Sequence, residues 1–334
     1  MAKFPSQRKL LYQTGALSND AFTQLSSGGV SGVLNLPKDL SILNRRGYAS
    51  TTRKGVPLVF QCKIDFYMHD EDGRGPSTAT NDTDGGNPMA SDLQAILKVD
   101  GCQNNWVMRN AAVKFHAARE EMFRKAGIKR GHRGAYSHEI RYNYDGNADT
   151  WLVPIDGDGD AFTGGTWDAT EMVTEDDTSF ALKLVGVAAS EDSDFGATAQ
   201  QIGYSYLASR ANLREDTNDE AENIGHFSVL QDMLSTGSVD PATRDNIVAN
   251  AEDEQDDLPY DPFVVNTDTN HDITEEVELG RAVAGFGNAY GSTIVEIPFG
   301  LAACKARVFD AADTAINPSG LMCVEVLDIY EMQG

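Results

Sequence analysis

Hydrophobic and polar residues alternate along much of this chain, which is the pattern of half-buried β-strands. In residues 58–69, LVFQCKIDFYMH, six alternate positions from Leu58 to Met68 are apolar and fall on one face. This period of two predicts a long strand that has one face in a core. Shorter runs of strand pattern cover residues 93–99, 139–144, 180–187, 201–207, 277–285, 293–299, 301–309 and 321–330.

Two stretches break the alternation, and both are predicted to be helices. The first spans about 105–126, with Asn104 or Asn105 as N-cap and Gly127 after the last turn. The second spans about 241–252 and begins with Asp240 as N-cap, followed by Pro241 in the first turn. Strands predominate and do not alternate regularly with helices, so the predicted fold class is mainly β rather than doubly wound α/β.

Charge is distributed unevenly between the two ends of the chain. Residues 1–141 hold 20 Lys and Arg against 13 Asp and Glu, whereas residues 142–334 hold 7 against 38, within a net charge of −24. The basic part is expected to lie against a polyanion, a lipid headgroup or the acidic part of the same or a neighbouring chain. An origin in sea water or brine is an alternative explanation of the acidic excess, because salt screens a surface rich in carboxylates.

The basic residues of the first part are the candidates for contact with a polyanion. Residues 101–141 carry 9 basic and 3 acidic side chains. Counterions for the acidic half of the chain are the alternative role, and the scarcity of aromatic residues here argues against sequence-specific reading of bases. The candidates are Lys3, Arg8, Lys9, Arg109, Lys114, Arg119, Arg124, Lys125, Lys129, Arg130 and Arg133.

Three aspartates in the segment DGDGD, residues 156–160, look like the start of a calcium-binding loop. An EF-hand needs Gly at its sixth position and Glu at its twelfth, where this chain has Ala161 and Trp167. A looser Ca²⁺ site and a solvated turn remain the two interpretations, and no other cofactor is expected. The candidate ligands are Asp156, Asp158 and Asp160.

Motifs of the common enzyme classes do not occur in the sequence. There is no G-x-S-x-G, no Walker lysine and no H-E-x-x-H, so we expect a protein that is not an enzyme. A hydrolase with His116, His138 or His271 as base stays an alternative. The four cysteines form no C-x-x-C pair and are expected to be buried free thiols, and neither a secretory signal nor a membrane-spanning run is expected.

The C-terminal segment STIVEIPFGL, residues 292–301, is followed by two further strand patterns and looks like the closing strands of a viral jelly roll. Residues 40–48, LSILNRRGY, and 104–116, NNWVMRNAAVKFH, resemble segments of capsid proteins of small tailless DNA viruses. The resemblance implies a jelly-roll β-sandwich, assembly into pseudo-hexagonal trimers and, in many such viruses, an internal lipid membrane.

We therefore expect a major capsid protein that is assembled in the host cytoplasm and located in the virion. The expected architecture is two jelly rolls in tandem, at residues 1–190 and 191–334, with a single jelly roll carrying large insertions as the alternative. Expected partners are other copies of the chain, other virion proteins, and the genome or an internal membrane through non-specific contact. The alternative function is a surface β-sandwich protein that binds calcium and glycans.

Overall fold

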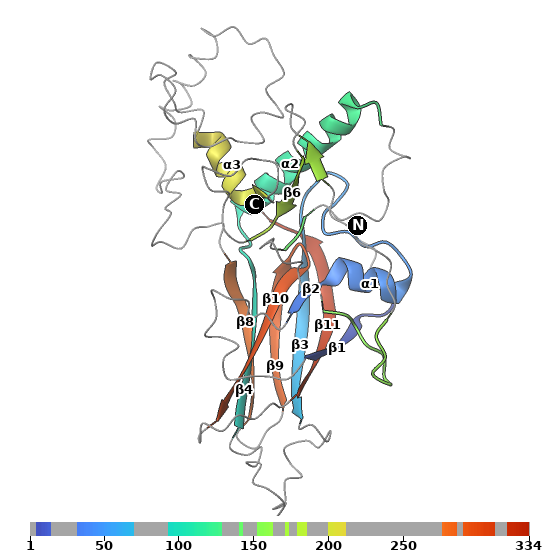
Figure 1. Cartoon of the computed structure of the whole chain (residues 1–334), viewed down its shortest axis with the longest axis vertical. Helices are drawn as coiled ribbons and strands as arrows, with labels where there is room; N and C mark the ends of the chain where they lie inside the picture. The colour runs from blue at the N-terminus through green and yellow to red at the C-terminus, as the bar shows by residue number, and fades with distance from the viewer. Residues whose placement is uncertain are drawn as a thin grey trace, which may run out of the picture.

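A computed structural model of the chain describes residues 5–14, 32–69, 93–128, 140–142, 152–162, 171–173, 179–185, 200–211, 276–285, 290–310 and 319–333. As predicted, this part of the chain is mainly β and its large sheets are antiparallel. The molecule is elongated, with two sheets of long strands below and a group of helices at the upper end (Figure 1).

Eight strands form the two four-stranded sheets. Sheet A has the order β1 (Lys9–Thr14), β11 (Ser319–Glu331), β3 (Leu58–His69) and β9 (Tyr290–Pro298). Sheet B has the order β2 (Gly32–Asn35), β10 (Leu301–Asp310), β4 (Leu93–Cys102) and β8 (Glu276–Gly285). Every pair of neighbouring strands in both sheets is antiparallel.

The first four strands pair with the last four in reverse order. β1 pairs with β11, β2 with β10, β3 with β9, and β4 with β8. The chain thus forms one long nested hairpin that is divided between two sheets, and the segment between β4 and β8 lies at its closed end. Strands from both sides of position 190/191 are hydrogen-bonded to one another in sheet A and in sheet B.

The space between the sheets is filled with apolar side chains. The alternation in β3 predicted this correctly, because Phe60, Cys62, Ile64 and Phe66 all lie in this core and are buried. Of the four cysteines, which are all free thiols, Cys62, Cys102 and Cys304 are buried and Cys323 is partly buried.

Helix α1 (Leu36–Asn44) connects β2 to β3 and was not predicted. Its N-cap is Asn35, whose side-chain oxygen accepts a hydrogen bond from the Lys38 backbone N–H at 3.1 Å. Leu36 and Leu40 are buried in the core between the sheets, which gives this short helix the tertiary packing that it needs.

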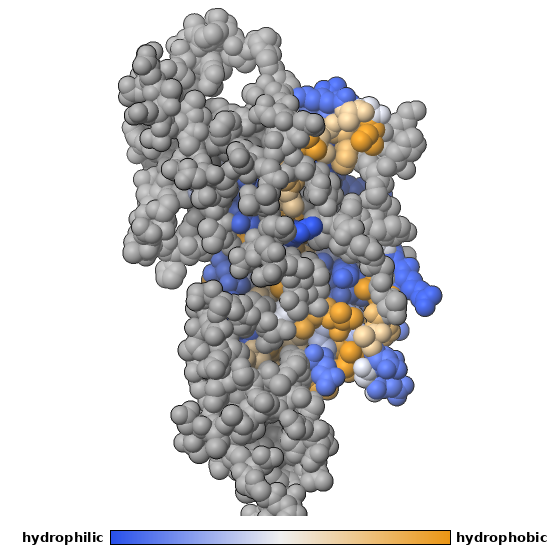
Figure 2. Space-filling model, in the orientation of Figure 1, coloured by the Kyte–Doolittle hydropathy of each residue, from blue (hydrophilic) through white to orange (hydrophobic). Residues whose placement is uncertain are grey.

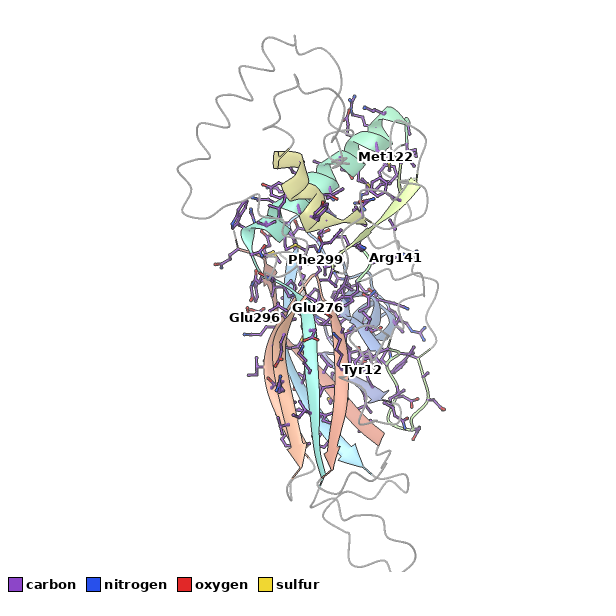
Figure 3. The ribbon with its side chains drawn as sticks, turned by 60° about the vertical axis from the view of Figure 1, so that its left-hand side comes forward. Tyr12, Met122, Arg141, Glu276, Glu296 and Phe299 are labelled. Carbon is purple, nitrogen blue, oxygen red and sulfur yellow. The ribbon has the colours of Figure 1, made fainter. Side chains whose placement is uncertain are left out.

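The segment between β4 and β8 adds α2 (Trp106–Lys125), α3 (Ile202–Ala211) and a small sheet of β5 (Glu171–Val173), β6 (Ser179–Lys183) and β7 (Gln200–Gln201). These elements share a second core with the end of the sandwich, in which Phe115 of α2 and Phe299 of the β9–β10 turn are buried. In Figure 3, Phe299 lies where the helices meet the strands. The connection from β4 to β8 is therefore a cap on one end of the sandwich.

The prediction of a helix at about 105–126 is confirmed by α2, with Asn105 as its N-cap. The predicted strand at 201–207 is wrong, because residues 202–211 form α3. Ile202 and Tyr206 are one helical turn apart and both are buried in the second core. The short alternation of this segment fits either a strand or a helix, so tertiary packing determines that it is a helix. The predicted helix at 241–252 lies outside the described residues.

Candidate functional site

The two lateral sides of the sandwich are built differently, and this difference defines the candidate functional site. On the side formed by β1 and β2, residues 152–162 run from one sheet to the other. The backbone N–H of Leu152 donates to the Val33 carbonyl at 2.9 Å, and the N–H of Ile155 donates to the Leu11 carbonyl at 2.8 Å. This segment covers the exposed edges of both sheets on the β1–β2 side.

On the opposite side, formed by β8 and β9, no described segment pairs with the outer edge of either strand. β8 and β9 lie close together here, because a Cβ atom added at Gly291 of β9 would collide with the backbone of Val283 in β8. Three apolar side chains on these two strands are exposed: Val277 by 38%, Val283 by 44% and Ile294 by 61%. Exposed apolar side chains on the outermost strands of a sandwich are typical of an interaction surface.

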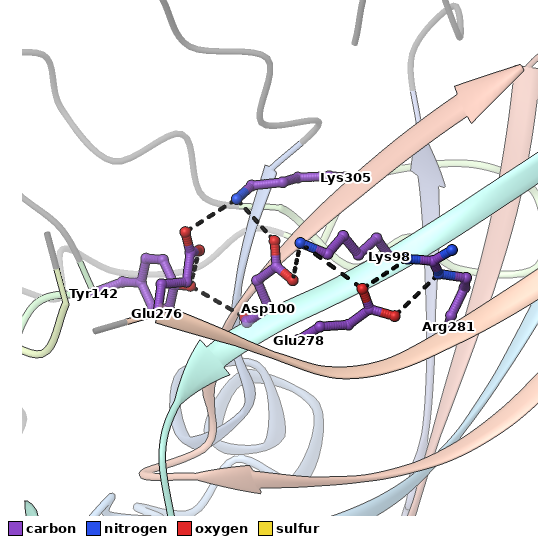
Figure 4. A network of polar contacts seen from close by, with 7 residues as sticks. All are labelled: Lys98, Asp100, Tyr142, Glu276, Glu278, Arg281 and Lys305. Atoms are coloured by element: carbon purple, nitrogen blue, oxygen red, sulfur yellow. Dashed lines mark hydrogen bonds and ion pairs between the residues drawn. The ribbon is translucent and has the colours of Figure 1, made fainter. Parts of the chain in front are cut away.

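A network of charged side chains occupies the outer face of sheet B beside this edge (Figure 4). Arg281 of β8 donates two hydrogen bonds to the carboxylate of Glu278, at 3.0 and 2.8 Å. On β4, the Lys98 ammonium lies 2.9 Å from an Asp100 oxygen and 3.9 Å from a Glu278 oxygen. The charges of β8 and β4 are therefore paired with one another rather than directed to solvent alone.

Two members of the network, Asp100 and Lys305, are buried. Lys305 of β10 donates to Asp100 at 2.8 Å and to Glu276 at 3.1 Å, and Tyr142 donates to Glu276 at 2.5 Å. Desolvation disfavours the charged form of Lys305, but the hydrogen bond to Asp100 and the charge of Glu276 outweigh it and raise the pKa of the lysine. Burial, with the charge of Glu276, raises the pKa of Tyr142. Both groups keep their protons at neutral pH and hold β8 against β4 and β10.

Taken together, this network contains three cations and three carboxylates. Its members come from β4, β8, β10 and residue 142, and they are Lys98, Arg281, Lys305, Asp100, Glu276 and Glu278, with Tyr142 as an uncharged donor. In a chain of net charge −24, this surface is locally balanced. A second copy can approach it without the repulsion that two acidic surfaces would have.

A second polar cluster lies on the outer face of sheet A, at β3 and β9. Asp65 accepts hydrogen bonds from Tyr290 and Ser292 at 2.7 Å each, and its carboxylate lies 2.9 Å from the Lys63 ammonium. Burial alone would raise the pKa of Asp65, but the bonds from Ser292, Lys63 and Tyr290 together lower it. This carboxylate is therefore an acceptor that stabilises the outer face.

The predicted polyanion-binding residues that the structure describes all interact with other groups of the chain. The Arg109 guanidinium donates to the Met332 carbonyl at 3.1 Å, and the Lys114 ammonium lies 5.1 Å from the centre of the Tyr206 ring. The other contacts are Arg119 with His116, Arg124 with Glu121, and Lys9 with Glu325. Arg8 and Lys125 are exposed, and Lys3, Lys129, Arg130 and Arg133 lie outside the described residues.

The aspartates of the proposed calcium loop form a turn on the β1–β2 side. One oxygen of Asp156 accepts hydrogen bonds from the backbone N–H groups of Asp158, at 3.0 Å, and Asp160, at 2.9 Å. This is the geometry of an Asx-type turn. Within the described ranges, no group of three or more His, Cys, Asp or Glu side chains is arranged to hold a metal.

Of the three histidines of the hydrolase alternative, the structure describes His116. His116 contacts Arg119 on the same helix, with 3.3 Å between Nδ1 and Nη2, and His138 and His271 lie outside the described residues. The charge network was not predicted from the sequence. The sequence signal for it is Lys305, which lies with Arg307 in the otherwise apolar run LAACKARVF of residues 301–309.

Comparison with protein-family models, with curated proteins and with solved structures gave no match. None of the described helices has the length and apolar character needed to cross a membrane.

Proposed function

We propose that this chain is the major capsid subunit of a small tailless DNA virus and that its copies assemble into an icosahedral shell. The observation that carries the proposal is the strand order. Two four-stranded antiparallel sheets, ordered β1-β11-β3-β9 and β2-β10-β4-β8, have the nested pairing of a jelly roll. Jelly rolls are the fold of many viral capsid domains, although lectins and cupins share it.

We infer a single jelly roll with a large insertion between β4 and β8, in place of two jelly rolls in tandem. Each of the four nested pairs joins a strand from residues 1–190 to a strand from residues 191–334. Two separate sandwiches would instead keep their strand pairs within each half. The inserted segment, with α2 and α3, then forms a cap on the end of one sandwich.

The core between the sheets favours a structural role over ligand binding inside the sandwich. The interior is filled by large apolar side chains that are each at most 1% exposed: Phe60, Ile64, Phe66 and Leu97. A jelly roll that binds a ligand within its barrel needs polar groups that converge on an open interior. Here the features available to a partner lie outside, on the β8–β9 side and at the far end of α2.

The β8–β9 side is the surface that we assign to contact between copies. It combines exposed Val283 and Ile294 with a charge network whose ions are already paired. Burying charges that are already paired costs less free energy of desolvation than burying unpaired charges. A stable contact of this kind buries at least about 1,200 Å² in total, which strands of nine and ten residues with their neighbours can supply.

Assembly of the purified protein tests this proposal directly. The full chain, expressed in a cytoplasm, is expected to form particles of uniform diameter in negative-stain images and to elute far above the mass of a 36.2 kDa monomer. Light scattering should be measured from low salt to about 1 M, because screening weakens the mutual repulsion of acidic chains. A monomer at every salt concentration would contradict the proposed function.

A further inference from the structure

The far end of α2 carries exposed apolar and basic side chains together. Ile128, just beyond the helix, is 39% exposed, and Val173 of β5 is 38% exposed. The two lie near the same turn of the helix, because the Ile128 N–H donates to the Phe123 carbonyl and the Val173 N–H contacts Met122 Sδ at 3.4 Å. In Figure 3, Met122 marks this end of α2, remote from the two large sheets.

Two basic residues lie beside these apolar side chains. Arg124 and Lys125 occupy the last turn of α2, and the Arg124 side chain is 74% exposed although it is paired with Glu121. Residues 119–133 contain six Lys or Arg and two Glu, within a chain of net charge −24. In Figure 2, apolar and strongly hydrophilic atoms lie next to one another at the upper end of the molecule.

We propose that this tip, defined by Met122, Arg124, Lys125, Ile128 and Val173, binds an anionic lipid surface. Cations at a helix C-terminus are explained by the helix dipole alone, but the exposed aliphatic side chains beside them are not. Aliphatic groups gain free energy when they enter the boundary between headgroups and acyl chains, while Lys and Arg are attracted to anionic headgroups. A phosphate backbone would attract only the cations, so the combination favours lipid over nucleic acid.

The position of the tip suits contact with an extended surface. α2 starts beside the sandwich, at the end of β4, and its last turn lies at the upper end of the long axis (Figure 1). The inference rests on the proposed function in one respect: in a shell, the tips of many copies would face one side together. Each tip then needs only weak affinity, because many weak contacts on one particle act together.

Vesicle flotation of the full chain tests this binding. Wild-type protein is expected to float with vesicles of phosphatidylcholine and phosphatidylglycerol at about 50 mM salt, and not with pure phosphatidylcholine. The pair Arg124→Gln and Lys125→Gln should lower the bound fraction about tenfold. The pair Ile128→Ser and Val173→Ser should lower it at least about tenfold. Light scattering ensures that samples of equal assembly state are compared.

Matched controls lie on the β1–β2 side of the sandwich. Val153→Ser removes an apolar side chain of 47% exposure, and Lys9→Gln removes an exposed charge, so both variants should float like wild type. The lipid proposal is overturned if wild type does not float, or if neither tip pair changes flotation. It is also overturned if the tip pairs abolish retention of single-stranded DNA while flotation is unchanged. If the protein forms particles but does not float, the lipid proposal fails and the capsid proposal stands. If it floats but forms no particles, the capsid proposal fails and the lipid proposal stands.

Discussion

The β1–β2 side and the β8–β9 side of this sandwich show two ways of treating the edge of a sheet. On the β1–β2 side, residues 152–162 bond to both sheets and cover their edges. On the β8–β9 side, no described strand pairs with the outer edge of either strand, Val283 and Ile294 are exposed, and the nearby charges are paired internally. Edge strands without a paired neighbour favour association. The contrast teaches that one side is covered within the chain, whereas the other is the surface that we propose for contact between copies.

The largest expected effect comes from placing charge on the β8–β9 side. The double variant Val283→Asp and Ile294→Asp adds two carboxylates where acidic copies would meet, so particles should be lost while the subunit stays folded. The control Val153→Asp likewise replaces an apolar side chain of similar exposure by aspartate, but on the β1–β2 side, and it should assemble like wild type. Negative-stain images and sedimentation velocity report the outcome. Equal loss of particles in both variants would remove the distinction between the sides.

A smaller but still large effect is expected from the buried part of the charge network. Asp100→Ala removes the carboxylate that lies 2.8 Å from the Lys305 ammonium, and a buried charge without its partner costs about 3 kcal/mol in the free energy of unfolding. Adding Lys305→Met to the same chain should restore much of that loss, because an apolar side chain then fills the site. Urea denaturation measures both variants. A loss below about 1 kcal/mol for Asp100→Ala would show that the network does not hold β8 in place.

Protonation of Asp39 should make the free energy of unfolding depend on pH. Asp39 lies on the β1–β2 side of the sandwich. Tyr12 of β1 donates to Asp39 at 2.6 Å, and both side chains are buried. Burial raises the pKa of Asp39 to about 7, although the hydrogen bond from Tyr12 and the nearby charge of Lys38 lower it. The folded state then binds a proton more tightly than the unfolded state, so the stabilisation is fully present below about pH 4 and is lost as the pH rises to about 7.

The variant Asp39→Asn isolates this contribution. The difference in unfolding free energy between wild type and variant is expected to shift by up to about 1.4 kcal/mol per pH unit between about pH 4 and pH 7, with wild type losing stability as the pH rises. Urea denaturation at a series of pH values checks this slope. A difference that is flat with pH would show that Asp39 is ionised in the folded protein throughout.

The smallest effect concerns the turn at Asp156 on the β1–β2 side. Asp156→Ala removes the acceptor of two backbone hydrogen bonds and should lower the unfolding free energy by about 1 kcal/mol. If the aspartates only form a turn, the melting temperature of wild type should be the same in calcium and in a chelator. A rise in melting temperature with calcium that Asp156→Ala abolishes would instead favour the calcium-binding alternative.

Sequence reasoning succeeded where a pattern was long. The alternation of residues 58–69 extends over twelve positions and predicted β3 with its correct bounds, and the N-cap and the final Gly127 of residues 105–126 predicted α2. Prediction failed where a pattern was short. Residues 202–211 form a helix because Ile202 and Tyr206 pack into the second core, and the nine-residue α1 was missed because so short a helix depends on the burial of Leu36 and Leu40.

The candidate site could not be predicted, since its members are distant along the chain. Lys98 and Arg281 are opposite one another only because β4 and β8 pair across the whole inserted segment. The predicted basic residues had the opposite outcome. Arg109 and Lys114 looked available for a polyanion, but folding places Arg109 against the Met332 carbonyl and Lys114 over the Tyr206 ring. A charge in the sequence does not reveal its partner.

The sequence by itself determined the mainly β character of this protein, its longest strand and helix, and the separation of basic and acidic residues, because these depend on local periodicity and composition. Tertiary structure alone decided the nested order of the strands, which sandwich edges are covered, and which charges are paired. The physical reason is that hydrogen bonds between strands join residues hundreds of positions apart. Such pairs have no signature in either segment alone.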